Sequence, residues 1–473
     1  MENDSDSGIS PDQEIDFCTF GMLIIDEIQY PPPRLPVSNI LGGAGTYAAV
    51  GARLFSPPPL SKRICWVVDA GSDFPSKLTS LIQSWETSVL LRQNPSRLTT
   101  RGINTYDANE KRDFKYSTPK LRIDVSDIES HPALLLSKSF HLICSPSRCI
   151  STVTNLLQAR KRLCPLTPKP IIVWEPVPDS CISSELLNLT NCLPYIDVCS
   201  PNHTELLNFF SESSTDHSDA DPGNESPDTN AIEEACEQLL AAMPLQTYAL
   251  VIRCGENGVY VAKNGGRSRR PSISGRVRKK RPANHARGGL TPDVDMAELF
   301  AGFDADADRG PISIDPGTSL WLPAYFESQK KGESRETSGV KSTLVSRSNS
   351  TTNKNSVLAE TSIFIQDSSR VVDPTGAGNS FLGALTVALA REKALEEAVC
   401  WGSVAASFIV EQIGTPLCTK LDKVQGLKSN YGSKHSNLTG SVVEAEEETW
   451  NNDSVPERLE RYLRRVQRGK IPE

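Results

Sequence analysis

The amino-acid sequence predicts an α/β protein in which a mainly parallel sheet is the middle layer of a three-layer α/β/α sandwich. Segments typical of strands and helices alternate along much of the chain, which is the order of β-α-β units. The strand segments are continuous apolar runs, which suit strands covered on both faces. One hairpin pattern lies outside this alternation and predicts a small separate β element.

The predicted elements follow one another from the N-terminal part onward. Strands are expected at 17–26, 63–69, 142–145, 171–174, 196–200 and 248–253. Helices are expected at 46–54, 150–163, 183–193 and 231–243. The hairpin pattern pairs Thr99–Tyr106 with Phe114–Tyr116 and predicts a small β element near 97–123. A further small β element is expected near 27–41.

Polar segments divide the chain of 473 residues. Residues 1–16 are acidic and polar, and they predict a disordered tail. One domain over 17–420 is interrupted by three segments with too few apolar residues to offset the entropy of ordering, so we predict disordered insertions at 211–230, 265–309 and 327–355. Leu320-Trp321-Leu322, between the last two, is assigned to the sheet. A C-terminal tail is expected at 421–473, with an amphipathic helix near 456–468.

Composition limits the partners of the chain. The formal net charge of −8 argues against a globally basic nucleic-acid binder. The twelve cysteines include no C-x-x-C pair, so neither a disulfide scaffold nor a zinc site is indicated. The polar start does not resemble a signal peptide, and no apolar run approaches a membrane helix. We expect a cytoplasmic protein without a membrane partner. The basic run 278–281 leaves nuclear import open, but no aromatic residues lie between the basic ones for stacking on RNA.

The strongest chemical signal is the glycine turn Gly376-Ala377-Gly378. An apolar lead-in precedes it, and a helical pattern follows it to about Arg391. Glycines allow successive backbone N–H groups to point at one spot, and a helix N-terminus adds partial positive charge. The pattern therefore predicts an anion site suited to phosphate, although a bare G-x-G is also typical of a plain tight turn.

The string Asp373-Pro374-Thr375-Gly376-Ala377-Gly378-Asn379 resembles the second signature of the pfkB/ribokinase family of carbohydrate kinases, in the variant of its fungal "maintenance of killer" branch. The resemblance implies that Gly376, Ala377 and Gly378 form an anion hole for the transferred phosphoryl group. It implies that residue 379 occupies the position of the catalytic base, an Asp in the family, which here is Asn379. It also assigns Thr375 to the nucleotide and Asp373 to a monovalent cation such as K⁺.

Further matches occur in the family's order and imply an acceptor site. Asp26 falls where the family carries an Asp for sugar hydroxyls, at the end of its first strand. Gly42 and Gly43 match a signature that opens a helix and holds the sugar. Tyr47 stands where the family has a sugar-contacting Asn. Taken singly, each match is also typical of an ordinary turn or strand end.

Two other matches imply the nucleotide and metal site. Asn202 and Glu205 resemble the N-x-x-E motif that organises Mg²⁺ and phosphate through water, and this hard ion prefers oxygen ligands. In isolation the same pattern is more typical of a helix cap. Gly255 and Gly258 resemble the strand-turn-strand that approaches the nucleotide, which on its own is an ordinary hairpin turn.

The resemblance implies a ribokinase-like fold with a small β lid and ATP-dependent, Mg²⁺-assisted phosphorylation of a sugar or polyol. Many members form homodimers through the lid, so a homodimer is left open. A general base contributes about 10² to 10⁴-fold to such a reaction, and an amide orients a hydroxyl without accepting its proton. Asn379 therefore predicts a slow kinase, a kinase with another base, or a protein that binds without turnover. Asp26 and Asp373 are the other carboxylates considered, and neither matches the base position.

Overall fold

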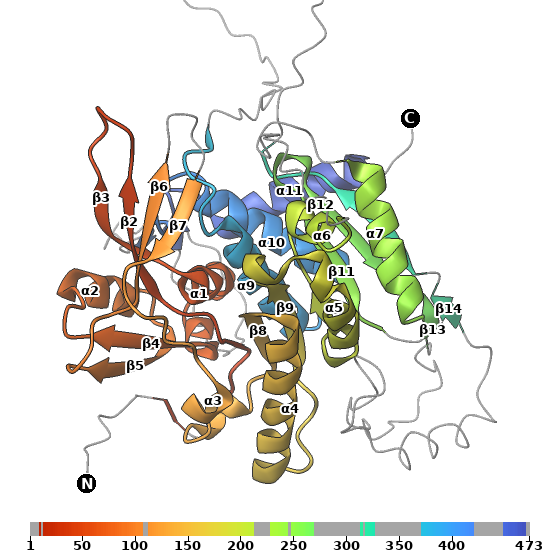
Figure 1. Cartoon of the computed structure of the whole chain (residues 1–473), viewed down its shortest axis with the longest axis horizontal. Coiled ribbons are helices and arrows are strands. Elements are labelled where there is room, and N and C mark those ends of the chain that lie inside the picture. The colour runs from red at the N-terminus through yellow and green to blue at the C-terminus, as the bar shows by residue number, and fades with distance from the viewer. Residues whose placement is uncertain are drawn as a thin grey trace, which may run out of the picture.

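The computed structural model of the chain is shown in Figure 1. It describes residues 9–10, 13–106, 112–211, 228–244, 247–268, 313–315, 317–326, 370–420 and 448–469. Most of the predicted N-terminal tail, most of the three insertions and the basic run at 278–281 lie outside the described residues. In the described end of the tail, Ile15 and Asp16 are buried, so the prediction of disorder is wrong there.

A nine-stranded sheet forms the middle of the molecule, in the order β15-β12-β11-β10-β9-β8-β1-β4-β5. Its strands are β1 (Phe17–Thr19), β4 (Ile64–Gly71), β5 (Ser88–Asn94), β8 (Ser139–Cys144), β9 (Ile171–Pro176), β10 (Val198–Cys199), β11 (Ala249–Arg253), β12 (Val259–Lys263) and β15 (Thr318–Leu322). Neighbours from β11 to β5 run parallel, while β12 and β15 are antiparallel additions at one edge. The predicted mainly parallel sheet is confirmed, with Leu320-Trp321-Leu322 in its edge strand β15.

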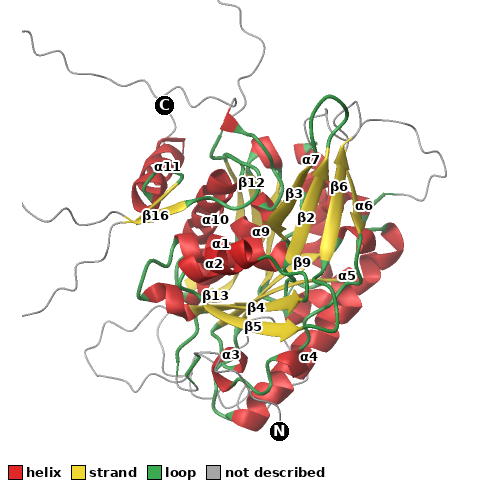
Figure 2. Ribbon diagram, turned by 90° about the vertical axis from the view of Figure 1, so that its left-hand side faces the viewer, coloured by secondary structure: helices red, strands yellow, loops and turns green. Residues whose placement is uncertain are grey.

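Helices cover both faces of this sheet (Figures 1 and 2). The strands supply alternate residues to two cores: Ile64 and Trp66 of β4 belong to one, and Cys65 to the other. The first core is closed by α1 (Ala44–Leu54), α2 (Ser76–Ser84), α9 (Ala377–Ala390), α10 (Leu395–Ile409) and α11 (Val455–Gly469). The second is closed by α3 (Pro132–Leu135), α4 (Pro146–Leu163), α5 (Leu186–Cys192), α6 (His203–Asn208) and α7 (Thr229–Ala242). This is the predicted three-layer sandwich.

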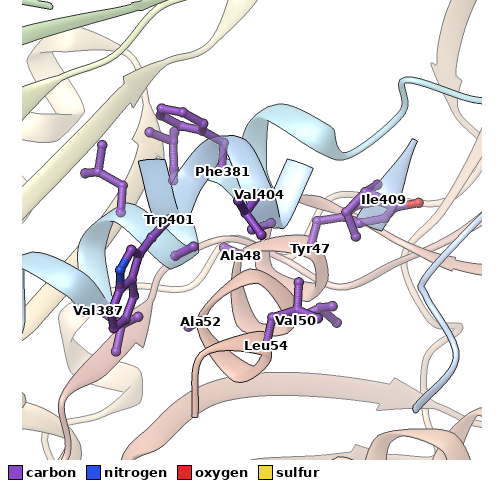
Figure 3. Close-up of a cluster of buried hydrophobic side chains, with 14 of the residues drawn as sticks. Tyr47, Ala48, Val50, Ala52, Leu54, Phe381, Val387, Trp401, Val404 and Ile409 are labelled. Carbon is purple, nitrogen blue, oxygen red and sulfur yellow. The ribbon is translucent and has the colours of Figure 1, made fainter. Parts of the chain in front are cut away.

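Helices α1 and α9 pack with their backbones in contact. A Cβ added at Gly51 would lie 2.0 Å from the carbonyl oxygen of Ser380, and one at Gly383 would lie 1.9 Å from that of Ala48. Buried apolar side chains from α1, α9 and α10 fill the space around this contact, as Figure 3 shows. The packing fixes the beginning of α9 relative to the beginning of α1, and both beginnings carry predicted site residues.

The prediction of one strand over Phe17–Asp26 is wrong. Residues 17–19 form β1 in the large sheet, whereas β2 (Ile24–Gln29) belongs to a separate small sheet. The chain changes sheets at Gly21, whose added Cβ would lie 2.5 Å from the backbone nitrogen of Gly45 at the start of α1. A continuous apolar run fits either one buried strand or two short ones, so hydrophobic pattern alone did not reveal the break.

The small sheet has the order β3-β2-β6-β7 and projects from the body in both views (Figures 1 and 2). Strand β2 pairs antiparallel with β3 (Val37–Gly42) and parallel with β6 (Arg101–Tyr106). The predicted hairpin is present as β6 and β7 (Arg112–Tyr116). These strands form the small sheet expected as the lid.

The prediction of a separate C-terminal tail is wrong for its described part. Strand β17 (Glu448–Trp450) pairs with β16 (Cys418–Lys420), and the predicted terminal helix is present as α11. Trp450 and Tyr462 are fully buried, so 448–469 belongs to the main domain. The second insertion also begins with a short strand, β13 (Gly266–Ser268), which pairs with β14 (Ser313–Asp315). No helix among the described residues has both the length and the apolar character needed to cross a membrane.

Candidate functional site

The glycine turn over 376–378 lies at the N-terminus of α9. Gly376 caps the helix with a φ of +82°, a left-handed conformation that favours glycine. The backbone N–H of Ala377 donates to the carbonyl of Pro374 at 3.2 Å, which closes the turn. The following amide, that of Gly378, has no acceptor within the helix, as is general for a first helical turn. The turn thus presents an N–H group together with the positive end of a helix dipole.

Asp373 shapes the approach to this turn. Its carboxylate, which is buried, accepts the backbone N–H of Thr375 at 2.9 Å. Thr375 therefore contributes its amide to the turn, and Asp373 holds that amide. The monovalent cation expected at Asp373 stays a prediction.

A cavity of about 370 Å³ opens beside the glycine turn. Its walls come from the β11–β12 connection, the segment after β15, the start of α9 and the C-terminal half of α10. The walls are mainly apolar, with Arg253 and Glu256 as charged members. The lining residues are Arg253, Gly255, Glu256, Gly258, Val259, Ala324, Tyr325, Phe326, Val371, Pro374, Ala377, Gly378, Phe381, Ser403, Ala406, Ser407 and Val410. An apolar cavity with an anion-binding turn at its mouth suits a ligand that joins a flat apolar ring to phosphate.

Gly255 and Gly258, both predicted at the nucleotide, line this cavity for different reasons. Gly255 has a φ of +55° and nothing within 4 Å of an added Cβ, so only its backbone conformation favours glycine. Gly258 has a φ of +87°, and an added Cβ would lie 2.0 Å from the carbonyl oxygen of Leu322. The second glycine is therefore needed for the packing of the wall.

Asn379 is held by a carboxylate that the motif analysis missed. Its Nδ2 donates to Oε2 of Glu175 at 2.6 Å. Glu175 lies near the end of β9 and is buried. The sequence did hold a signal, because a charged residue directly after the buried run Ile171–Trp174 marks the carboxyl end of a parallel strand, where ligands of open α/β sheets bind.

Arg253, at the end of β11, connects the charged groups of the site. Its Nη2 donates to Oε1 of Glu175 at 2.5 Å and to the carbonyl of Ser200 at 2.9 Å, and it lies 3.6 Å from Oε2 of Glu205. An added Cβ on Gly378 would lie 2.0 Å from Nη1 of Arg253. The guanidinium therefore packs directly against the glycine turn. None of the sequence motifs includes Arg253.

The pKa values of the two carboxylates beside Arg253 shift in opposite directions. Burial works to raise the pKa of Glu175, but the charge of Arg253 holds it below its ordinary value. Burial raises the pKa of Glu205 to about 7, with Arg253 opposing and the charge of Glu175 adding to the rise. The charge of Arg253 thus outweighs the effect of burial on the pKa of Glu175 but not on that of Glu205.

Asn202 and Glu205 form a reciprocal capping box at the start of α6. Oδ1 of Asn202 accepts the backbone N–H of Glu205 at 2.8 Å, and Oε2 of Glu205 accepts that of Asn202 at 2.8 Å. No cluster of three or more His, Cys, Asp or Glu side chains in the described part of the chain is suited to hold a metal directly. The single carboxylate of Glu205 fits a magnesium ion that keeps its waters and arrives with substrate phosphates.

The predicted acceptor residues lie on the small sheet and on α1. The Asp26 carboxylate is buried, and its Oδ2 lies 2.0 Å from the Cβ position of Gly42. Gly43 caps α1 with a φ of +90°. Tyr47 is 2% exposed, and its ring lies 2.3 Å from the Cβ position of Gly376. Tyr47 therefore packs on the first glycine of the turn and joins the acceptor residues to it.

The small sheet also approaches the glycine turn. Burial raises the pKa of Tyr30, next to the end of β2, and the charge of Asp373 contributes to the rise. The turn, the acceptor residues and the capping box therefore surround one region at the carboxyl ends of the parallel strands. This arrangement places the amide of Gly378 beside the guanidinium of Arg253 and the carboxylate of Glu175 beside residue 379.

The comparisons with known proteins agree with this geometry. The family model described as pfkB family carbohydrate kinase matches residues 336–421. The structure of ribokinase from Giardia lamblia superposes with a TM-score of 0.50 at 14% identity, covering 85% of this chain and 95% of that one. The fold is ribokinase-like, and the part of the chain over 336–421 matches the pfkB carbohydrate kinase family.

Two relatives are similar to most of this chain. Protein MAK32 of Saccharomyces cerevisiae is 29% identical over 409 residues, which cover 84% of this chain and 85% of that protein. An uncharacterised protein of Schizosaccharomyces pombe is 26% identical over 453 residues, covering 96% of this chain and 94% of the relative. The chain is therefore similar over most of its length to relatives of the "maintenance of killer" type that its glycine-turn signature resembles.

Proposed function

We propose that this chain binds ATP with Mg²⁺ in the cavity beside α9 and that its phosphorylation of a sugar or polyol hydroxyl is weak. The observation that carries the proposal is the apolar cavity of about 370 Å³ with the glycine turn at its mouth. Its walls suit a nucleoside, and the turn suits the phosphates. A stretch of 74 residues that is 42% identical to the inositol 3-kinase of Arabidopsis thaliana, covering 14% of this chain, favours a polyol as acceptor.

Weak turnover follows from the chemistry at residue 379. Phosphoryl transfer depends mainly on positioning and charge stabilisation, and a base adds about 10² to 10⁴-fold. The amide of Asn379 donates to Glu175 and accepts no proton from an acceptor hydroxyl. Glu175 is the carboxylate in contact with Asn379, but its lowered pKa makes it a poor base.

Magnesium, when bound with the nucleotide, neutralises charge on the phosphates. Glu205 would face its water shell, and Asn202 holds the Glu205 backbone in place through the capping box. The glycine turn would position the terminal phosphate by hydrogen bonding.

A second function is a binding protein that has lost turnover. Tyr47 favours it, because the residue at the position of the family's sugar-contacting Asn is buried against Gly376 and offers no amide to an acceptor. The closed Glu175–Arg253 ion pair, deep in the site, points the same way.

Calorimetric titration of the full chain with ATP-Mg²⁺, followed by turnover assays on a panel of sugars and polyols including inositol, tests the proposal. We expect ATP binding and slow phosphorylation of one acceptor. Ala406→Trp, which fills the cavity wall, is expected to abolish binding, whereas Leu163→Trp on the exposed side of α4 is expected to preserve it. Binding without turnover on any acceptor selects the second function. Absence of nucleotide binding to the unmodified chain refutes both.

A further inference from the structure

Arg253 lies between the nucleotide cavity and two buried carboxylates. It lines the cavity, and its side chain is 13% exposed. Its Nη1 lies 2.0 Å from the Cβ position of Gly378, so any phosphate held by that glycine's amide lies next to the guanidinium. The carboxylates of Glu175 and Glu205 lie within 4 Å of its Nη2.

The hydrogen bonding of Arg253 is incomplete. Nη2 serves both Glu175 and the carbonyl of Ser200, whereas Nε has no partner among the described residues although it is buried. Buried donors are normally satisfied, and an unsatisfied one costs free energy. Both protons of Nη2 are thus in use, and Nη1, beside the glycine turn, is the group placed to give a phosphate a charge-assisted hydrogen bond.

The carboxylates do not explain an arginine of this kind on their own. The capping box already holds Glu205 through backbone groups, and its distance of 3.6 Å from Nη2 is too long for a direct hydrogen bond. Only Glu175 forms a short contact. One end of the guanidinium is therefore tied to Glu175, and the other end faces the glycine turn without a carboxylate.

We propose that Arg253 is a phosphate ligand of the bound nucleotide, acting together with the amides at the start of α9. Resting on the proposed nucleotide binding, this inference adds a positively charged side chain to a site that the sequence motifs describe as backbone alone. The ion pair with Glu175 pre-orients the guanidinium before the nucleotide arrives, which lowers the entropic cost of ordering it on binding. The alternative is that Arg253 obstructs the turn, in which case its removal would strengthen binding.

Titration of the full chain with adenosine, ADP-Mg²⁺ and ATP-Mg²⁺ tests the inference, because adenosine probes the cavity without the phosphates. In Arg253→Gln we expect ATP and ADP to bind about 10 to 100-fold more weakly, as for the loss of a charge-assisted hydrogen bond. Adenosine affinity is expected to stay within about twofold, and the salt dependence of ATP binding is expected to decrease.

Controls separate this outcome from loss of folding. Arg253→Gln leaves Glu175 buried without its cation, so Arg253→Gln/Glu175→Gln provides a charge-balanced variant that should show the same selective loss of phosphate affinity. Arg92→Gln removes another ion-paired arginine, one on the far edge strand β5, and should bind all three ligands as the unmodified chain does.

Unchanged or tighter ATP binding in both Arg253 variants would overturn the inference, and the tighter result would identify an obstruction. A parallel loss of adenosine and ATP would also overturn it, because that result assigns Arg253 to the shape of the cavity. Failure of the unmodified chain to bind both ADP-Mg²⁺ and ATP-Mg²⁺ would instead refute the proposed function itself.

Discussion

Replacing Asn379 with Asp places two carboxylates in contact. Nδ2 of Asn379 now donates to Oε2 of Glu175 at 2.6 Å, and an Asp side chain would bring an oxygen to the same place. Two unit charges at that separation repel by about 6 kcal/mol at an effective dielectric constant of about 20. The folded protein avoids most of this energy by binding one extra proton, which the two carboxylates share.

The cost of Asn379→Asp therefore depends on pH. The folded pair has an upper pKa above the ordinary Asp value of about 3.9, so the folded state binds more protons than the unfolded state above that pH. Stability relative to the unmodified chain then falls as the pH rises through the upper pKa of the pair. We expect a loss of about 3 to 5 kcal/mol in the free energy of unfolding at pH 8. At pH 4 the shared proton restores a hydrogen bond, and the expected loss is about 1 kcal/mol or less.

Urea unfolding of the variant at several values between pH 4 and pH 8 measures this loss. Asn379→Asp/Glu175→Gln reverses the hydrogen bond, since the Gln amide can donate to the new Asp, and should recover at least about 2 kcal/mol at pH 8 as a coupling energy. The same double variant places a carboxylate at residue 379 without the repulsion. If the missing base limits the reaction, its turnover should rise about 100-fold or more over the unmodified chain. A pH-independent loss of stability, or no recovery in the double variant, would refute the contact between residues 379 and 175.

Two further predictions concern the glycine turn and the capping box. Gly376→Ala should lower the free energy of unfolding by at least about 1 kcal/mol more than Gly255→Ala, because both residues have positive φ but only Gly376 faces a side chain, that of Tyr47; equal losses in urea unfolding would contradict this packing. Glu205→Gln should become increasingly stabilising relative to the unmodified chain as pH rises from about 4.3, the unfolded value, to about 7, because burial raises the pKa of Glu205 to about 7 and the folded state then holds a proton that the unfolded state releases. A stability difference that stays constant from pH 4 to pH 8 would show that Glu205 keeps an ordinary pKa.

Local pattern was sufficient to predict most of the architecture. Strands covered on both faces leave continuous apolar runs, and Ile171–Trp174 was assigned from that feature alone. The glycine turn was equally visible, because a left-handed cap before a helix demands glycine at residue 376. The failure at 17–26 has the same origin as these successes, since apolar character records burial and does not record which sheet buries a residue.

The charged centre of the site was less accessible to sequence reasoning. Asn379, Glu175 and Arg253 lie far apart in the chain, and their mutual contacts depend on the order of strands β9, β10 and β11 in the sheet. A motif contains residues close together in sequence, so it identified the substitution at 379 without the carboxylate that accepts the hydrogen bond of Asn379. Arg253 is the last residue of an ordinary buried strand, β11, and nothing in its local sequence marks it as the cation of the site.

The contacts among these residues bear on what Asn379 means. An Asp at residue 379 would compete with Glu175 for Arg253, whereas Asn supplies a donor to the same carboxylate. Tyr47 packs on the glycine turn that precedes Asn379. Two residues depart from the family signatures at positions that meet here. Tyr47 contacts the turn, and Asn379 belongs to one hydrogen-bonded group with Glu175. Because interactions within such a group are not additive, restoring Asp at residue 379 alone should lose stability without gaining a fast reaction. A fast reaction is expected only when residue 175 is changed with it, and the double variant separates a site that lacks one group from a site rebuilt around its absence.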